Sequence, residues 1–239
     1  MDTARTYLLD LSRRLANPAL AAALSEATDA VEASVRRGGL TYVLGTGHSH
    51  LLALDLHYRA GGPAFAVPVL DEGLMLHRSA LGSSAREREA GVAAAMLARY
   101  PLSDRDVLIV ISNSGVNAVP VEAAQVGRAA GATVIALTSL AYSAMAAQGR
   151  PRLADLAQVV IDNGLPPGDA LAELPGTGLR AGPGSTVVGG ALLQALFVEV
   201  AARLSAEGPP PIWLSANLPA AAEHNRALAE RYGPMNPHL

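Results

Sequence analysis

The segment Val107–Ile111, which reads VLIVI, decides the fold, and the polar turn Ser112-Asn113-Ser114-Gly115 follows it directly. A continuous β-branched run of this length is typical of a strand covered by helices on both faces. Such strands belong to parallel sheets, whose ligands bind beyond the carboxyl ends of the strands. The turn after this strand is therefore the first place to look for function.

Short apolar runs of the same character occur on both sides of this segment. They predict further strands over residues 40–44, 64–69, 133–137 and 158–161, and residues 212–215 are a candidate for an additional last strand. Apolar residues at helical spacing lie between and after them, over about 49–60, 86–99, 118–130 and 185–205. Strands that alternate with helices indicate βαβ units. We therefore expect an α/β protein, a three-layer α/β/α sandwich around a parallel sheet of five strands.

The chain is expected to form a single domain over residues 1–239, because no linker divides it. Residues 1–38 have helical spacing, and Pro18 splits them into a pair of helices, since proline favours the start of a helix. Residues 40–207 form the predicted α/β core. Residues 208–239 are a C-terminal extension.

The composition excludes several kinds of chemistry. The chain has neither cysteine nor lysine, which removes thiolate catalysis, disulfides, Schiff bases and the P-loop lysine. The net charge is −3 and no basic block occurs, so nucleic-acid binding is not predicted. No apolar run reaches the roughly 18 residues of a membrane span. We expect a cytoplasmic protein with neither a membrane nor a nucleic acid as partner.

Small hydroxyl residues and glycines follow several predicted strands. GTGHS follows the first strand, SNSG the third and TS the fourth, while GPGST opens the late helix. Backbone N–H groups and the helix dipole favour an anion at such turns. Helix capping explains any one of them equally well. Their shared position on one sheet edge favours an anion site.

Together these motifs resemble the SIS (sugar isomerase) domain of phosphosugar isomerases and phosphosugar-binding regulators. The resemblance covers about residues 41–204, and DEGLMLH and SANLPAAAEHN are similar to a phosphoheptose-isomerase-like branch of phosphosugar-binding proteins. It implies a flavodoxin-like or Rossmann-like sheet, a homodimer and a phosphorylated sugar as ligand. The ligand-binding positions that it implies are Gly47, His48, Ser49, Ser112, Asn113, Ser114, Asn117, Thr138, Asp169 and Ser185, although Asp169 could instead only cap a turn.

The zinc site of phosphoheptose isomerases is not implied. Those enzymes carry a His and a Glu on the first helix and a Gln and a His on the late helix, where this chain has Asp55, Arg59, Gly190 and Leu193. Three histidines lie at 48, 50 and 57, but without the spacing of a zinc cage. We expect no metal and no cofactor.

Aldose–ketose isomerisation needs a base that moves a proton between adjacent carbons. Glu72 and His77, in the loop after the second strand, are the first choice, and Asp55 is the alternative. Asp55 could instead pair with Arg59 on the same helix, and loop residues are often merely solvated. His224 could reach the site of a neighbouring subunit.

Three functions remain open on the sequence. The first is a sugar-phosphate aldose–ketose isomerase. The second is a sugar-phosphate lyase or etherase, which also begins by removing a proton next to a carbonyl. The third is a non-catalytic phosphosugar sensor that regulates a partner. The residues before the first strand lack a basic helix-turn-helix face, which favours an enzyme.

Overall fold

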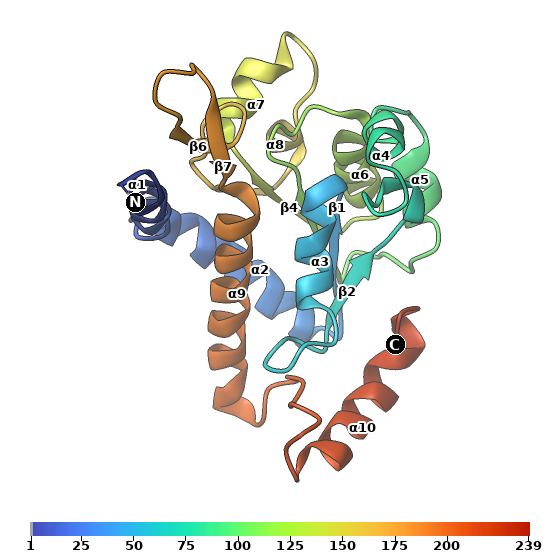
Figure 1. Ribbon diagram of the computed structural model, residues 1–239. Helices are drawn as coiled ribbons and strands as arrows, with labels where there is room; N and C mark the ends of the chain where they lie inside the picture. The colour runs from blue at the N-terminus through green and yellow to red at the C-terminus, as the bar shows by residue number, and fades with distance from the viewer. Residues whose placement is uncertain (1) are drawn as a thin grey trace.

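The computed structural model describes residues 2–239 and is built around a five-stranded parallel sheet (Figure 1). The strand order is β2-β1-β3-β4-β5. The α/β class and the parallel sheet predicted from the sequence are therefore confirmed. The strands are β1 (Thr41–Gly45), β2 (Ala66–Val69), β3 (Val107–Ile111), β4 (Thr133–Thr138) and β5 (Val159–Asp162).

Helices cover both faces of the sheet, which is why β3 is buried along its whole length. One group packs together on one face and consists of α2 (Leu20–Arg36), α3 (His50–Leu56) and α9 (Ser185–Leu204), with α1 (Asp2–Leu15) against α9. The other group consists of α5 (Val92–Leu97), α6 (Ala118–Ala129) and α8 (Leu153–Leu156). Burial on both faces explains the unbroken apolar runs of the strands.

Two local predictions are wrong. The single helix expected over residues 86–99 is two helices, α4 (Ala80–Arg86) and α5, because Gly91 adopts a φ of 84° between them. The strand expected over residues 212–215 is an isolated antiparallel bridge between Ile212 and Pro63. The Trp213 N–H donates to the Gly62 carbonyl and the Ala64 N–H to the Pro211 carbonyl, each at 2.9 Å, so this segment pairs with the residues before β2 and not with a strand of the sheet.

Several elements were not anticipated from the sequence. A two-stranded antiparallel hairpin, β6 (Ala170–Glu173) and β7 (Arg180–Pro183), stands directly before α9, and α7 (Leu140–Ala147) follows β4. The C-terminal extension forms η3 (Ser205–Glu207), α10 (Ala221–Tyr232) and η4 (Gly233–Met235). Figure 1 shows α10 apart from α9, with a loop between them.

The segment Ser185–Glu207 is long and apolar enough to cross a membrane by length and composition, the only such helix among residues 2–239. This corrects the expectation that no segment would reach that length. In the structure α9 packs against α1, α2 and α3 and buries Leu192, Leu196 and Val200. Packing inside the domain thus accounts for part of its apolar composition, while Val187 and Val198 remain exposed.

The strand order creates a switch point between β1 and β3. The chain leaves β1 for β2 on one side, and later strands add on the other side, starting with β3. In open α/β sheets a crevice forms at this point, beyond the carboxyl ends of the two strands, and ligands bind there. The fold therefore directs attention to the turns after β1 and β3.

Candidate functional site

The turns that follow β3, β4 and β5 are tied to one another by hydrogen bonds. The Ser139 backbone N–H donates to the Asn113 carbonyl at 3.1 Å, and Thr138 Oγ1 donates to the same carbonyl at 3.3 Å. Asn163, just after β5, donates its Nδ2 to Asn113 Oδ1 at 2.9 Å. Three predicted turns thus form one connected edge centred on Asn113.

The SNSG turn itself is closed by a side chain and a glycine. Ser112 Oγ accepts the Gly115 N–H at 3.1 Å, and Ser112 is only 5% exposed. Gly115 has a φ of 60°, a left-handed conformation that side chains disfavour. A Cβ placed there would lie 3.1 Å from Thr138 Oγ1. Glycine at this position lets the β3 and β4 turns meet.

Two buried donors at this turn have no hydrogen-bond partner among residues 2–239. They are Nδ2 of Asn113 and the hydroxyl of Ser143, which lies on α7. Ser143 Oγ is close to the turn, since a Cβ on Gly115 would approach it to 3.5 Å. A buried donor without a partner costs about 1–3 kcal/mol. These donors are therefore suited to a ligand that offers several acceptor oxygens.

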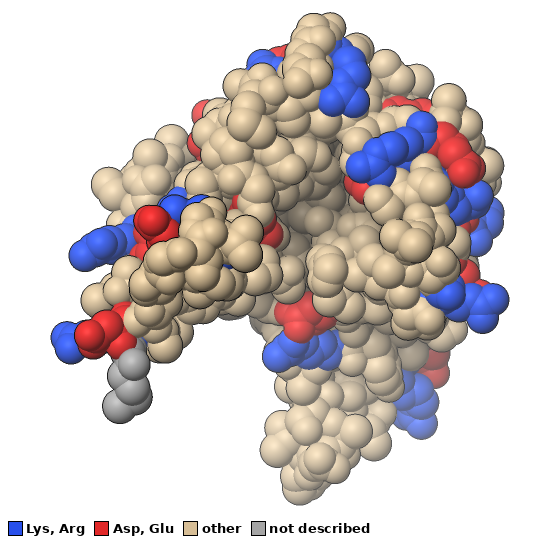
Figure 2. Space-filling model, turned by 45° about the horizontal axis from the view of Figure 1, so that its top comes forward, with Lys and Arg blue, Asp and Glu red and all other residues tan. Residues whose placement is uncertain are grey.

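The β1 turn forms the opposite wall of the crevice. Thr46 leads into η1 (Gly47–Ser49) and then into the N-terminus of α3. The His50 ring is buried and its Nδ1 meets the Gly47 carbonyl at 2.6 Å, whereas His48 is exposed. Figure 2 turns the top of the molecule forward and shows a hollow rimmed mainly by uncharged residues.

Ser185 and Asp169 are brought together, but as a helix cap. Asp169 Oδ1 accepts the backbone N–H groups of Gly184 and Ser185 at 3.1 and 2.8 Å, and Asp169 Oδ2 accepts the Ser185 hydroxyl at 2.5 Å. A carboxylate is favourable at the positive end of a helix. The start of α9 is therefore already occupied by an anion of the chain itself. Asn117, by contrast, begins α6 without a side-chain capping bond.

The predicted catalytic residues after β2 lie on the surface. Glu72 belongs to η2 (Glu72–Leu74), its side chain is 75% exposed, and it faces Arg78 at 3.5 Å. His77 is also exposed. Their loop nonetheless leans toward the β1 turn, since Leu76 lies 3.9 Å from where a Cβ on Gly47 would be.

Asp55 joins a group that the sequence did not reveal. One of its oxygens pairs with Arg59 on the same helix, as the alternative interpretation proposed, and the other accepts Gln194 Nε2 from α9 at 2.9 Å. Gln194 follows Leu193 in the sequence, and the spacing of residues along the chain did not predict its contact with Asp55. Within residues 2–239 no group of three or more His, Asp or Glu side chains is arranged to hold a metal ion.

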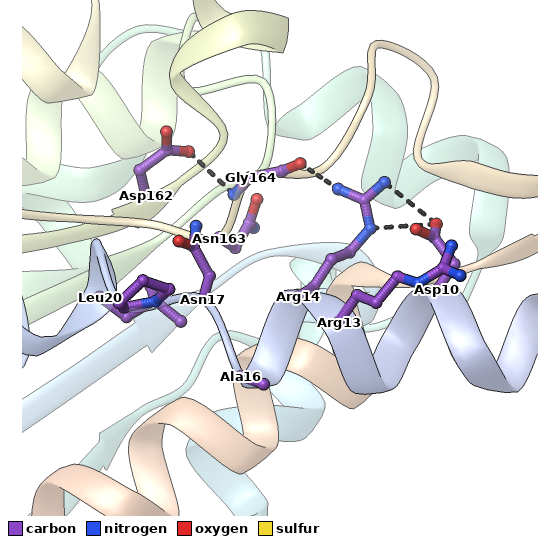
Figure 3. Close-up of a pocket in the computed structure, with 10 residues that line it drawn as sticks. Asp10, Arg13, Arg14, Ala16, Asn17, Leu20, Asp162, Asn163 and Gly164 are labelled. Carbon is purple, nitrogen blue, oxygen red and sulfur yellow. Dashed lines mark hydrogen bonds and ion pairs between the residues drawn. The ribbon is translucent and has the colours of Figure 1, made fainter.

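Two further features lie outside these turns. A cleft of about 390 Å³ opens at the end of β5 and is lined by α1 and by residues 162–164. Figure 3 shows Arg14 in this cleft, bonded to Asp10 at 3.0 Å and to the Gly164 carbonyl. In the C-terminal extension, His224 Nε2 meets the Ile212 carbonyl of its own chain at 2.8 Å. That contact anchors α10 to the segment before it.

The fold and this row of hydroxyl turns define an SIS protein, and the comparison with known families agrees. The family model described as SIS domain matches residues 6–139, and the chain belongs to that family. UPF0309 proteins of Brucella canis and Brucella abortus are each 50% identical to it over 235 residues, which is 98% of this chain and 97% of theirs.

Solved structures share the fold at low sequence identity. A phosphoheptose isomerase from Francisella tularensis is 17% identical, with a TM-score of 0.55, over 83% of this chain and 96% of that one. An E. coli CFT073 protein, solved in complex with a phosphosugar, is also 17% identical, with a TM-score of 0.50, over 83% of this chain and 85% of that one.

Proposed function

We propose that the chain binds a phosphorylated sugar, with the phosphate held by the turns after β3 and β4. The observation that carries this proposal is the pair of unpartnered buried donors, on Asn113 and Ser143, beside the hydroxyls of the SNSG turn. A phosphate offers several strong acceptor oxygens, and it needs no lysine where backbone and hydroxyl donors converge. The phosphosugar complex of a protein with the same fold supports this choice of ligand.

The reaction that suits this site best is aldose–ketose isomerisation of the sugar phosphate. Isomerisation moves a proton between carbons next to a carbonyl, and a carboxylate or histidine beside the crevice suffices for it. The phosphoheptose isomerase among the structures of the same fold supports an isomerase. A lyase or etherase would share the first proton transfer, and a sensor would bind without any transfer.

A homodimer completes the proposal. Large apolar side chains are exposed along α3, just after it and on α9, namely Leu51, Leu54, Tyr58, Val187 and Val198. These helices pack against each other, so the exposed residues lie on neighbouring elements. A second copy of the chain would cover them, and light scattering should give twice the mass of 24.5 kDa. We expect Val198→Glu to yield a monomer; a monomeric wild type would contradict the dimer.

Thermal shift with a panel of sugar phosphates tests the binding proposal. A ligand at one hundred times its dissociation constant should add about 2.7 kcal/mol to the free energy of unfolding. We expect stabilisation by at least one sugar phosphate and none by the matching free sugar. Asn113→Ala should lose the effect. Ser205→Ala, which changes η3 far from the turns in sequence, should retain it. No stabilisation by any sugar phosphate would overturn the proposed function.

A further inference from the structure

Glu87 places a carboxylate at the switch point of the sheet. Its Oε1 accepts a hydrogen bond from Thr46 Oγ1 at 2.7 Å. Thr46 is the first residue after β1 and is only 6% exposed. Glu87 itself lies just beyond the end of α4 and is partly buried. The carboxylate of a distant segment is thus fixed to the first turn of the site.

The backbone of Glu87 is fixed to the other wall of the crevice. Its carbonyl accepts the Val119 N–H at 3.0 Å, in the first turn of α6, the helix that follows SNSG. In the sheet, Gly45 of β1 is paired with Ile111 of β3, so Thr46 and Ser112 each come one residue after a paired position. Glu87 therefore bridges the β1 turn and the start of α6, the helix that follows the β3 turn.

The charge of Glu87 is not neutralised by an ion pair within residues 2–239. Both neighbouring arginines are engaged elsewhere: Arg86 pairs with Asp71 at 3.1 Å, and Arg88 bonds to Ser84. Other carboxylates of the region have structural partners. Asp55 pairs with Arg59, and Glu122 accepts the backbone N–H groups that begin α5. Among these groups Glu87 is the one whose side chain bonds only to a hydroxyl.

We propose that Glu87 is the catalytic base of this site, and the proposal rests on the sugar-phosphate function above. With the phosphate at the β3–β4 turns, the sugar chain extends toward β1, where Glu87 lies. Oε1 is held by Thr46, which leaves Oε2 for the substrate. Thr46 is thus a positioning residue.

The carboxylate of Glu87 can both remove and return the proton on carbon. Glu87 takes the proton from the carbon next to the carbonyl, and the C–H electron pair forms a carbon–carbon double bond while the carbonyl π pair moves onto oxygen. A proton passes between the two neighbouring oxygens. Glu87 then returns its proton to the former carbonyl carbon, and the new carbonyl forms at the other carbon. The carboxylate is regenerated and no further reactant is needed.

Deuterium exchange and thermal shift, measured on the same variants, test this role. The probes are glucose 6-phosphate, fructose 6-phosphate and arabinose 5-phosphate, with incorporation from D₂O at the carbon next to the carbonyl followed by proton NMR. Glu87→Gln keeps an acceptor for Thr46 but loses the base. We expect its exchange rate to fall at least about 100-fold, with the thermal shift retained. Glu89→Gln removes the same charge two residues away and should behave as the wild type.

Further variants separate positioning from folding. Thr46→Val should lower the rate of deuterium exchange less than Glu87→Gln does. Thr46→Ser, which keeps the hydroxyl, should exchange at nearly the wild-type rate. If Glu87→Gln fails to fold, Glu87→Asp keeps the charge but withdraws it by one methylene, and should bind while exchanging slowly. Wild-type exchange in Glu87→Gln, or a wild type that binds a probe and exchanges none, would overturn the role of Glu87. A wild type that no probe stabilises would overturn the site itself.

Discussion

The middle of the sheet, at β3 and β4, and its β2 end differ in how the carboxyl ends of the strands are held. At β3 and β4, backbone and side-chain hydrogen bonds converge on Asn113, and two buried donors remain without partners. At β2, the tips of the loop are exposed at Glu72 and His77, while its backbone is held by the Tyr100 hydroxyl, which accepts the Leu70 N–H at 2.9 Å, and by the Ser83 hydroxyl, which donates to the Leu74 carbonyl at 2.8 Å. The first edge is cross-linked by hydrogen bonds and keeps free donors, whereas the second exposes two polar side chains to solvent.

This difference indicates where a ligand is bound. An edge that is cross-linked by hydrogen bonds and keeps unpaired donors is organised for a ligand before the ligand arrives, which lowers the ordering cost of binding. In the β2 loop, Glu72 and His77 point into solvent, and replacing exposed side chains changes stability little. Substitutions at the β3–β4 edge should therefore have larger effects than those in the β2 loop.

Gly115→Ala should give the largest effect. Its left-handed φ costs a side chain roughly 1 kcal/mol, and the close approach to Thr138 should add about 1 kcal/mol or more. We expect both a loss of about 2 kcal/mol in urea unfolding and loss of the ligand-induced thermal shift. Gly149→Ala is the matched control, because Gly149 has a φ of 82° but no atom within 4 Å of its Cβ position. Equal losses of unfolding free energy in both variants would show that the close approach to Thr138 adds nothing.

Ser139→Ala and Ser143→Ala should differ although both serines are buried in the same region. Ser139 Oγ donates to the Leu165 carbonyl at 2.6 Å and accepts the Tyr142 N–H that begins α7. Its loss should cost about 1–2 kcal/mol. Ser143 has no partner to lose within residues 2–239, so its replacement should leave the free energy of unfolding nearly unchanged and weaken only ligand binding. A large loss of stability in Ser143→Ala would contradict the open-donor interpretation.

The β2 end should be sensitive to pH. Burial lowers the pKa of His57, although the His238 carbonyl opposes this, and burial together with the charges of His57 and Arg99 lowers the pKa of His238. Histidines with a lowered folded-state pKa stabilise the fold above the unfolded pKa of about 6.5, and that stability is lost as pH falls below it. We expect the melting temperature to fall between about pH 7 and about pH 5. The double variant His57→Asn, His238→Asn should flatten that decline.

Glu72→Gln and His77→Ala should have the smallest effect on stability, within about 0.5 kcal/mol, because both side chains are exposed. Their effect on deuterium exchange distinguishes the two catalytic assignments. Near wild-type exchange in both would favour Glu87. A large loss of exchange without loss of binding would instead make the β2 loop the source of the base.

The sheet and its polar edge could be predicted because their signals are local. The run VLIVI is buried on both faces wherever such a strand occurs, and the hydroxyls of SNSG and of Thr138 follow their strands directly or end them. The hairpin of β6 and β7 was missed because its residues carry no alternating apolar pattern. The break at Gly91 was missed because a glycine inside a helical pattern does not by itself reveal a left-handed φ.

The sequence by itself therefore determined the α/β sheet and the hydroxyl turns at the carboxyl ends of its strands. Only the tertiary structure decided which side chains share those turns. Thr46 meets Glu87 across 41 residues, Asn113 meets Asn163 across 50, and Asp55 meets Gln194 across 139. Strand periodicity is set by neighbouring residues, whereas such pairs depend on how whole elements pack, and local sequence spacing holds no record of that packing.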